Sequence, residues 1–370
     1  FHSGRRIRPI FRLPPVLAFA AGASAAAADW PHWRGPNGTG ATSETNLPVR
    51  WSATENVAWK AAIGGLGIST TIVSGDQVLV TSQIGTAERR PGNHPRLVQG
   101  GNAADAGERA LGGTRRPQAD DGHVHFLVEC FRRADGRRLW EYRLAAEGPM
   151  PGVHDKHNLA SPSPITDGQM VYAWFGTGQI VALDMGGKLV WQRHLGKEIS
   201  PFEVAWGHSS SPTLFGDLLI LLCDHEPSAY LLAVDKRTGQ QRWKADRGKG
   251  RMSYSTPLVV DAATGPELVV NSSERVDAYD PSTGTLLWFT GSTNRFPIPM
   301  PVFHDGMIYM SRAYRSSPYM AIRPAGRGDV SKTHVLPESA TGGPYISSLV
   351  YDAGLIYMAT GVGGVTVLDA

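Results

Sequence analysis

The stretch 161–191, SPSPITDGQMVYAWFGTGQIVALDMGGKLVW, constrains the fold most, because its pattern recurs along the chain. It holds four short β-rich runs, separated by an Asp-Gly turn at 167–168 and by glycine-containing turns at 176–178 and 186–187. Short runs of this kind joined by such turns are the signal of antiparallel hairpins. Four in succession predict one four-stranded antiparallel sheet.

The pattern makes this a repeat protein. The first repeat begins at Ser69 and closes at Trp140, and later repeats begin at Ser211, Thr256, Met300 and Ser347. Their spacing of roughly 45 residues is the size of one propeller blade. Stacking such sheets around an axis buries their faces, and closing the ring removes exposed edges. We therefore predict an all-β fold, a β-propeller of four-stranded antiparallel blades. The fifth repeat has no tryptophan, and its last strand is predicted over 333–336.

A second signal links the third and fourth strands of each repeat. It consists of a small residue, an aspartate, a glycine and a tryptophan. A small residue fits between crowded blades, the aspartate accepts hydrogen bonds from turn amides, and glycine takes a positive φ. The tryptophan packs onto the next blade. The predicted docking residues are Ala182, Asp184 and Trp191; Ala233, Asp235, Gly239 and Trp243; Ala278, Asp280, Gly284 and Trp288; and Trp140 in the first repeat.

These tryptophan-docking repeats resemble the pyrroloquinoline quinone (PQQ)-like β-propeller repeats, and the resemblance covers Trp30 to Ala370. The leader WPHWRGPNG (30–38) is similar to the start of many exported bacterial proteins of this type. Two groups of known role share the repeat, the quinoprotein alcohol dehydrogenases and the propeller scaffold lipoprotein of outer-membrane protein assembly. The resemblance implies a ring of about eight blades in the full protein, of which about five and three-quarters would be present here.

The N-terminal residues differ from the repeats. In residues 1–28, arginines precede an apolar run at 13–23, and Ala25 to Ala28 offers a small-residue cleavage site. This pattern predicts a signal peptide, and the run is too short to span a bilayer. We expect an exported protein, periplasmic or extracellular, with no transmembrane segment in the mature chain. Residues 29–60 are predicted to be an arm that ends in a ring-closing strand at 56–60.

The propeller, residues 61–370, contains an insertion at 85–122 that is rich in Gly, Arg and Ala and has no periodicity. Its composition predicts a flexible segment. The chain does not begin with Met and stops in mid-repeat, so we expect a fragment of a longer product. Cys130 and Cys223 fall in strands of different repeats. We predict buried free thiols, and a disulfide is the alternative in an exported protein.

Charge and motifs exclude some functions. The net charge is +3, from 36 basic and 33 acidic side chains, which gives no clustered excess for nucleic-acid binding. No glycine-rich phosphate loop opens a helix, so nucleotide binding has no support. We predict no nucleic-acid partner and no metal site.

Candidate ligand residues precede the first strands of several repeats. They are His154 and His157 in the second, His208 in the third, Tyr254 in the fourth and Tyr345 in the sixth. First strands line the channel of a propeller, so these side chains could ring its mouth. His157 with His208 could bind a metal or an anion, although neither run has compact metal spacing. The alternative is that they hydrogen-bond backbone or water between blades.

Arginines gather around the fifth repeat, and the candidates for an anion site are Arg295, Arg312 and Arg315. Arginine suits recognition of carboxylate or phosphate, and ion pairs between blades are the alternative. The segment Asp224-His225-Glu226 is predicted to be a solvated hairpin turn.

Two functions remain. The first is a non-catalytic binding or scaffold module, a monomer at full length, that binds another protein or a cell-envelope ligand and needs no cofactor. The alternative is a PQQ-dependent oxidoreductase resembling alcohol or sugar dehydrogenases. The resemblance then implies PQQ, a Ca²⁺ ion and an aspartate base, and in many members a disulfide between adjacent cysteines. This sequence has no adjacent cysteines, and we assign no catalytic residue.

Overall fold

The computed structural model describes residues 28–45, 47–85, 123–153, 157–291, 293–294, 296–312, 318–336, 339, 342–361 and 363–370. Residues 1–27 of the predicted signal peptide and 86–122 of the insertion lie outside these ranges, as do His154, Arg295 and Arg315. In the described part of the chain, no helix is long and apolar enough to cross a membrane. One helical turn, α2 (Leu195–Glu198), is present there.

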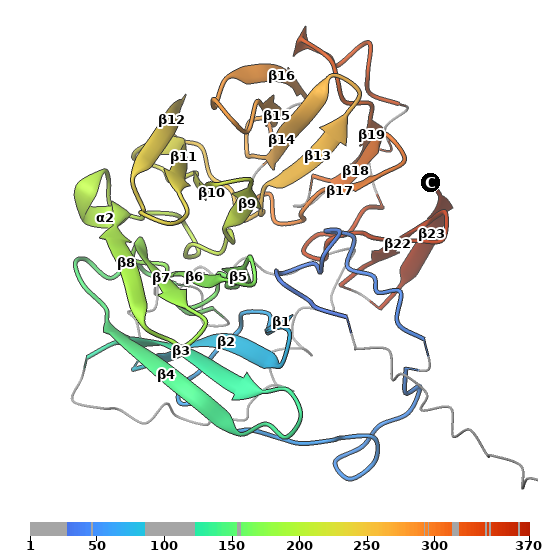
Figure 1. The fold of residues 1–370 in the computed structure, drawn as a ribbon. Helices are drawn as coiled ribbons and strands as arrows, with labels where there is room; N and C mark the ends of the chain where they lie inside the picture. The colour runs from blue at the N-terminus through green and yellow to red at the C-terminus, as the bar shows by residue number, and fades with distance from the viewer. Residues whose placement is uncertain are drawn as a thin grey trace, which may run out of the picture.

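The strands form six antiparallel sheets in chain order, which we call blades 1 to 6. Figure 1 shows them arranged around a common axis, which confirms the predicted all-β propeller. Three blades have four strands, namely β1 (Ile72–Ser74), β2 (Gln77–Ile84), β3 (His125–Arg132) and β4 (Arg138–Ala145); β5 (Ile165–Thr166), β6 (Met170–Trp174), β7 (Gln179–Asp184) and β8 (Leu189–His194); and β9 (Thr213–Phe215), β10 (Leu218–Cys223), β11 (Ala229–Asp235) and β12 (Gln241–Gly248).

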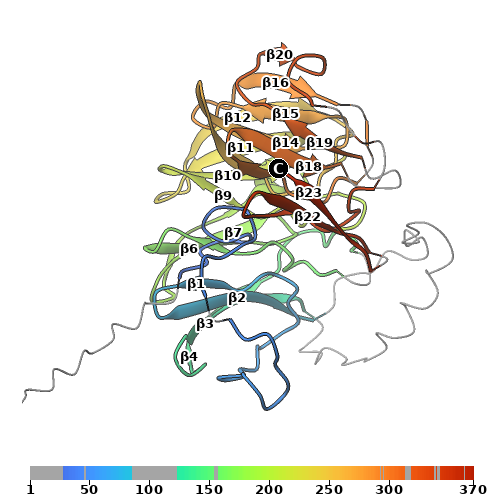
Figure 2. The same cartoon turned by 90° about the vertical axis from the view of Figure 1, so that its right-hand side faces the viewer.

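The later blades deviate from this plan. Blade 4 adds a fifth strand, which runs parallel to its outermost strand and comes from the fifth repeat. Blades 5 and 6 have three strands each in the described residues. Their bounds are β13 (Leu258–Ala262), β14 (Gly265–Asn271), β15 (Val276–Tyr279), β16 (Leu286–Thr290) and β20 (Gly328–Asp329); β17 (Val302–His304), β18 (Met307–Ser311) and β19 (Tyr319–Ile322); and β21 (Val350–Asp352), β22 (Leu355–Ala359) and β23 (Val365–Asp369). In Figure 2, β22 and β23 lie in front of the other blades.

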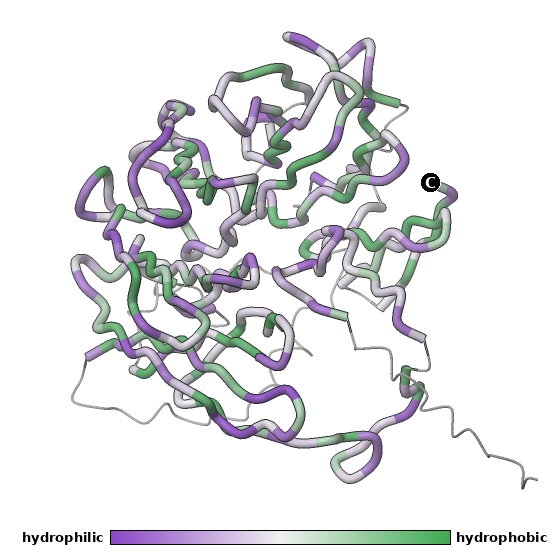
Figure 3. The backbone as a smooth tube through the Cα atoms, in the orientation of Figure 1, coloured by the Kyte–Doolittle hydropathy of each residue, from purple (hydrophilic) through white to green (hydrophobic). Residues whose placement is uncertain are grey.

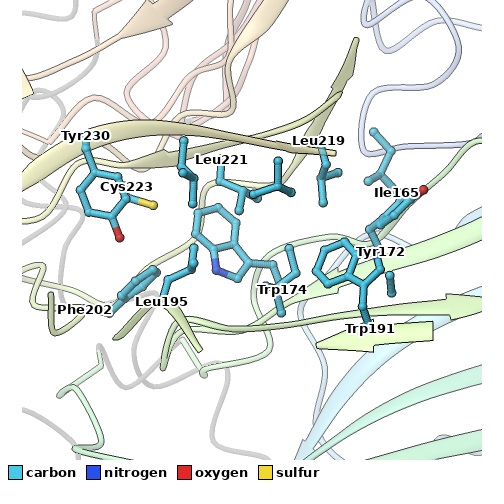
Figure 4. Close-up of a cluster of buried hydrophobic side chains, with 14 residues drawn as sticks. Ile165, Tyr172, Trp174, Trp191, Leu195, Phe202, Leu219, Leu221, Cys223 and Tyr230 are labelled. Atoms are coloured by element: carbon cyan, nitrogen blue, oxygen red, sulfur yellow. The ribbon is translucent and has the colours of Figure 1, made fainter. Parts of the chain in front are cut away.

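The core lies between blades, and we call each contact between successive blades a seam. Apolar side chains of β6 and β10, such as Trp174 and Leu221, meet in seam 2/3 (Figure 4). Phe126 of blade 1 stacks on Phe175 of blade 2, with ring centroids 4.3 Å apart. Hydrophobic stretches follow the strands within the body, whereas hydrophilic residues gather at the turns (Figure 3). Burial between blades therefore drives their stacking.

An inner belt of hydrogen bonds joins the first strands. At each step a backbone N–H of one blade donates to the hydroxyl that precedes the first strand of the next blade. The steps are Thr70 to Ser163 at 2.9 Å, Ser163 to Ser211 at 3.0 Å, Ser211 to Thr256 at 3.0 Å and Met300 to Ser348 at 3.0 Å. Seam 4/5 lacks this step, because Met300 stands at the hydroxyl position.

An outer row of tryptophans joins the fourth strands to the following blades. Each indole nitrogen donates to a backbone carbonyl of the neighbouring turn, and each ring lies on the glycine of that turn. The pairs are Trp140 with Met185 and Gly187, Trp191 with Lys236 and Gly239, and Trp243 with Pro281 and Gly284, at N···O distances of 3.0, 2.9 and 3.1 Å. A Cβ on any of these glycines would approach the ring to 2.5–2.8 Å, so only glycine fits.

The other docking residues occupy the neighbouring positions of the motif. The buried alanines lie across the sheet from the tryptophans, as Ala182 from Trp191, Ala233 from Trp243 and Ala278 from Trp288. The carboxylates accept backbone N–H groups of their turns, namely Asp184 from Gly186, Asp235 from Thr238 and Asp280 from Ser282. Trp288 differs from the expectation, because its Nε1 donates to Glu267 of its own blade at 2.7 Å.

Two strand predictions are wrong. Residues 56–60 form no strand, yet Trp59 donates to the Arg133 carbonyl at 2.8 Å and lies on Gly136, as a preceding blade's tryptophan would. The last strand expected at 333–336 is reduced to a single bridge between Val335 and Ile322, because the chain first leaves to pair β20 with blade 4. Docking on the next blade thus does not require the tryptophan to lie in a strand.

The arm crosses the axis, where it lies near the centre of Figure 1 between β5 and β22. Trp30 pairs with Val73 of β1, and the Pro31 carbonyl accepts the N–H of Thr166 in β5 at 3.0 Å. Further on, Trp33 donates its indole N–H to the Met300 sulfur at 3.2 Å, and Arg34 donates to the Leu349 carbonyl. The arm therefore ties blades 1, 2, 5 and 6 together at one end of the channel.

Cys130 and Cys223 are buried and free, as predicted. They lie in β3 and β10 of different blades, and burial raises the pKa of each thiol, to about 12 for Cys130. A thiol with a raised pKa is a poor nucleophile, so both side chains act as small apolar core residues.

Candidate functional site

The two ends of the channel differ in what lines them. We call the end where the chain enters each first strand the mouth face, and the end covered by the arm the arm face. Because the strands alternate in direction, turns between first and second strands lie on the arm face. The sequence candidates precede the first strands and so belong to the mouth face.

Tyr254 lies at the mouth face among aromatic side chains. Its hydroxyl accepts the backbone N–H of Trp206 at 3.3 Å, and its own N–H donates to the Pro297 carbonyl at 2.9 Å. The Phe296 ring lies 6.4 Å from the Tyr254 ring and 6.2 Å from the Trp206 ring. Phe296 has a φ of 58°, which is uncommon for a bulky residue. These contacts join the connections that lead into blades 3, 4 and 5.

His208 lies deeper and is only 1 % exposed. Its ring packs on Trp174 at 4.2 Å and faces His225 at 5.5 Å, in the same seam as Phe202. Burial lowers the pKa of His208 well below its usual value, and the neighbouring histidines add to the shift. Burial also lowers the pKa of His225, to about 3. Both imidazoles are therefore neutral at physiological pH and act as members of an aromatic seam.

The structure separates the remaining candidates. His157 is half-buried against Gly207, where an added Cβ would lie 3.1 Å from its Nδ1. Arg312 is 2 % exposed and donates to Asn271 across seam 4/5 at 2.9 Å. Tyr345 is half-buried in the connection to blade 6. The candidates are thus distributed over several seams.

The sequence analysis missed an ion-pair network in seam 3/4. The Asp224 carboxylate accepts hydrogen bonds from Nε and Nη2 of Arg247, at 2.7 and 3.1 Å. Nη1 of Arg247 lies 3.0 Å from Asp277. Arg251 adds a contact of 2.6 Å to Asp277. Burial alone would raise the pKa of Asp224, but the charge and hydrogen bonds of Arg247 lower it. The pairing keeps the buried Asp224 carboxylate ionised.

The prediction of a solvated turn at Asp224-His225-Glu226 is wrong for its first two residues. Asp224 is 1 % and His225 0 % exposed. The Phe202 ring of the connection after α2 lies 4.0 Å from the His225 ring, and the Glu226 N–H donates to the Glu203 carbonyl at 2.9 Å. Asp224 accepts hydrogen bonds from Arg247 and Ser272. Local sequence gives a hairpin here but contains no sign of the covering segment. Spacing alone also gave no sign that Arg247 would meet Asp224.

A Ca²⁺ ion with PQQ would need carboxylate or other oxygen donors that face the ligand. In the described ranges, no group of three or more His, Cys, Asp or Glu side chains is placed to hold a metal ion. Each buried carboxylate there contacts protein donors, and these include Glu129 with Gly64 and Arg138, and Glu267 with Trp288 and Ala325. Protein groups therefore engage the buried carboxylates of the described residues.

The arm face carries a cavity of about 590 Å³. Its roof is formed by arm residues 32–33 and 36–38, and its walls are formed by the first strands of blades 2 to 5. The walls combine apolar side chains, such as Trp33, Leu258, Met300 and Phe303, with polar ones, such as Thr213. The volume lies within the range of ordinary ligand pockets. No candidate from the sequence lies here, because the cavity exists only where the arm crosses the axis.

Two charged side chains line this cavity, and both are acidic. Asp261 is the penultimate residue of β13, and Asp305 forms the turn between β17 and β18 with a φ of 45°. Both are exposed, on neighbouring blades 4 and 5. His304 also lines the cavity and stacks on Tyr351 of blade 6, with ring centroids 3.8 Å apart. The cavity therefore has mixed polar and apolar walls and two acidic side chains.

Comparison with protein families gives one result that covers most of the chain. A family model of PQQ-like repeats, described as outer membrane protein assembly factor BamB, matches residues 37–200 and 121–370. A search of the curated proteins gave no match.

Solved structures of two kinds are similar to the chain. BamB from Moraxella catarrhalis is 14 % identical with a TM-score of 0.41, over 67 % of this chain and 82 % of that one. The quinohemoprotein alcohol dehydrogenase from Comamonas testosteroni is 12 % identical with a TM-score of 0.46, over 64 % and 50 %. The quinohemoprotein alcohol dehydrogenase ADHIIG from Pseudomonas putida HK5 is 12 % identical with a TM-score of 0.47, over 81 % and 52 %. The chain thus spans about half the length of the two dehydrogenases.

Proposed function

The chain belongs to the family of PQQ-like β-propeller repeat proteins, and from this premise we propose that it is a non-catalytic binding or scaffold module. The fold alone does not decide this, because one fold hosts binding proteins and enzymes. The proposal therefore depends on what the side chains of the channel do.

The observation that supports the proposal is the use of the buried carboxylates. Calcium and an aspartate base both need carboxylate oxygens that face the ligand. In the described part of the chain, Asp224 and Asp277 at the mouth end of their strands are held by Arg247 and Arg251. Removing such a carboxylate from its partners would leave buried charges unpaired. These residues hold blades together, so we expect no cofactor.

The partner is proposed to be another protein or a cell-envelope ligand, met outside the cytoplasm. The signal-peptide pattern of residues 1–28 supports export to the periplasm or beyond. The described blades leave a binding surface on each face of the channel, and the arm face offers a formed cavity. We expect the full-length protein to bind as a monomer.

A titration tests the proposal against the PQQ-dependent alternative. The protein is mixed with PQQ and Ca²⁺, and the absorbance of the quinone and the reduction of an electron-acceptor dye are followed with alcohols and sugars. We expect neither stoichiometric PQQ binding nor turnover. Stoichiometric binding with dye reduction would overturn the proposal and establish the dehydrogenase. A dehydrogenase of known activity, assayed alongside, controls for the dye and the substrates.

A further inference from the structure

We propose that the arm-face cavity binds an extended peptide segment of a partner protein, with a lysine or arginine side chain facing Asp261 and Asp305. The inference rests on the proposed binding function and names the chemistry of its partner. It is carried by the charge of the lining, by the strand edges that form the walls, and by a break in the repeat at this place.

The charge of the lining selects a cation. Asp261 and Asp305 are its two charged side chains, and neither lysine nor arginine lines the cavity. Neither aspartate has an ion pair among the described residues, whereas Asp167 at the equivalent turn of blade 2 pairs with Lys236 at 2.9 Å. A lysine or arginine from a partner would supply the missing opposite charge, and the apolar side chains of the lining would cover its methylene stem.

The walls are strand edges. The first strands β9, β13 and β17 are the inner edges of their sheets, and each has a neighbour on one side only. An extended peptide adds to such an edge through its backbone, and its alternate side chains enter pockets. This mode favours a peptide over a small amine, because the cavity runs along three edges.

The arm itself provides a precedent for this mode of binding. It is an extended segment that pairs through its backbone with β1 at Trp30 and Val73, and donates no side chain to do so. Its Pro31 carbonyl then accepts the N–H of Thr166 in β5. The arm thus pairs with the inner edges of blades 1 and 2, and farther along the chain it forms the roof of the cavity.

The repeat is broken at this cavity. Met300 replaces the hydroxyl that would continue the inner belt, and its sulfur accepts the indole N–H of Trp33 instead. A Cβ on Gly38 would lie 3.0 Å from Leu258, so the arm fits closely over the same seam. Departures from a repeat rule that are compensated locally are expected at functional sites.

The test is a fluorescence anisotropy titration of the full chain with a fluorescein-labelled peptide, Ser-Val-Thr-Lys-Val-Thr-Ser. We expect saturable binding that weakens roughly tenfold or more when the central lysine is replaced by glutamate. The double variant Asp261→Asn and Asp305→Asn should weaken binding of the lysine peptide by a similar factor and should erase the difference between the two peptides. Both substitutions keep the shape of the side chain, so the fold is preserved.

Asp352→Asn is the matched control, because Asp352 is an exposed aspartate at the corresponding turn of blade 6 and lies outside the cavity lining. It should leave the affinity unchanged. Equal affinity for the two peptides, no saturable binding, or an unaffected double variant overturns the inference. If putrescine at equal concentration displaces the peptide, the cavity binds a small amine, and the inference that it binds a peptide is overturned. The peptide titration does not measure PQQ binding or turnover. A negative result there would therefore leave the proposed function to be decided by the PQQ titration.

Discussion

Seams 3/4 and 4/5 bury similar apolar clusters but are held by different polar contacts. Seam 3/4 follows the rule of the earlier seams, with Trp243 on the Pro281 carbonyl and Gly284, and with Ser211 donating to Thr256. These contacts use backbone acceptors and one hydroxyl. A rule built from backbone groups tolerates sequence change in most side chains, which is why a repeat can be copied from blade to blade.

Seam 4/5 lacks both of these contacts, and specific side chains lie at the equivalent places. Glu267 accepts Trp288, and Asn271 donates to the carbonyls of Pro299 at 3.0 Å and Ser311 at 3.1 Å. The thioether of Met300 replaces the hydroxyl of the belt. Stability at this seam therefore depends on these side chains, whereas at seam 3/4 the glycine and backbone contacts are joined by the buried ion pairs of Arg247 and Arg251 with Asp277.

The largest effect is expected at the glycine of a regular seam. Gly284→Ala places a Cβ 2.5 Å from the Trp243 ring, at a φ of 74°. The clash displaces the docked ring, and the positive φ adds strain, so we expect a loss of about 3 kcal/mol in the free energy of unfolding. Equilibrium denaturation in urea measures it.

Gly306→Ala separates the two causes. Gly306 has a φ of 76°, but an added Cβ there would meet nothing within 4 Å. In this control the free energy of unfolding should fall only by the cost of the backbone strain, about 1 kcal/mol. Equal losses at the two glycines would mean that the tryptophan contact contributes nothing to seam 3/4.

The next effect tests the irregular seam. Glu267→Ala removes the acceptor of the buried Trp288 N–H and of the Ala325 N–H, which lies 3.1 Å away. Two unsatisfied buried donors should lower the free energy of unfolding by about 2 kcal/mol. Glu267→Gln keeps one oxygen as an acceptor, so its free energy of unfolding should fall by about half as much. A stability unchanged by Glu267→Ala, measured in the same urea titration, would show that water replaces the carboxylate.

The sequence predicted the parts of the fold that repeat. Trp191, Trp243 and their glycines are found at fixed spacing, because one local geometry is reused at each regular seam. Trp288 has the same spacing and yet bonds Glu267, and the fifth repeat meets it with strand β20, where Gly328 pairs with Trp288. The spacing of the motif locates the tryptophan that donates the hydrogen bond. It does not tell whether the next blade has a carbonyl in place to accept it.

The candidate site was less predictable for a related reason. His208 and Tyr254 became candidates because they precede first strands, whereas Asp261 and Asp305 look like ordinary polar residues until the arm is placed over the cavity. Burial of His225 likewise depends on a connection from a distant part of the chain. Such sites are made by contacts between segments that carry no common pattern, so periodicity does not locate them.

A smaller effect compares the inner belt with its gap. Ser211→Ala leaves the buried N–H of Ser163 without its hydroxyl acceptor, which lies 3.0 Å away, and should cost about 1.5 kcal/mol. Ser347→Ala, at an exposed serine next to the belt residue Ser348, should change stability by less than about 0.5 kcal/mol. If Ser211→Ala matches this control, the belt is a consequence of packing and the gap at Met300 has no energetic meaning.

The smallest effect is a pH dependence that belongs to seam 2/3. Burial lowers the pKa of His225 to about 3, below the 6.5 of an unfolded histidine. The unfolded chain therefore takes up the proton first as the pH falls. The stability that neutral His225 contributes is complete above about pH 6.5 and is lost progressively toward pH 3, with about 1 kcal/mol lost between pH 7 and 5.5. His225→Gln should flatten this part of the stability profile, whereas His123→Gln, at an exposed histidine, should leave it unchanged. If the free energy of unfolding of His225→Gln still falls between pH 7 and 5.5 as it does in the parent chain, the acid sensitivity does not come from His225 in seam 2/3.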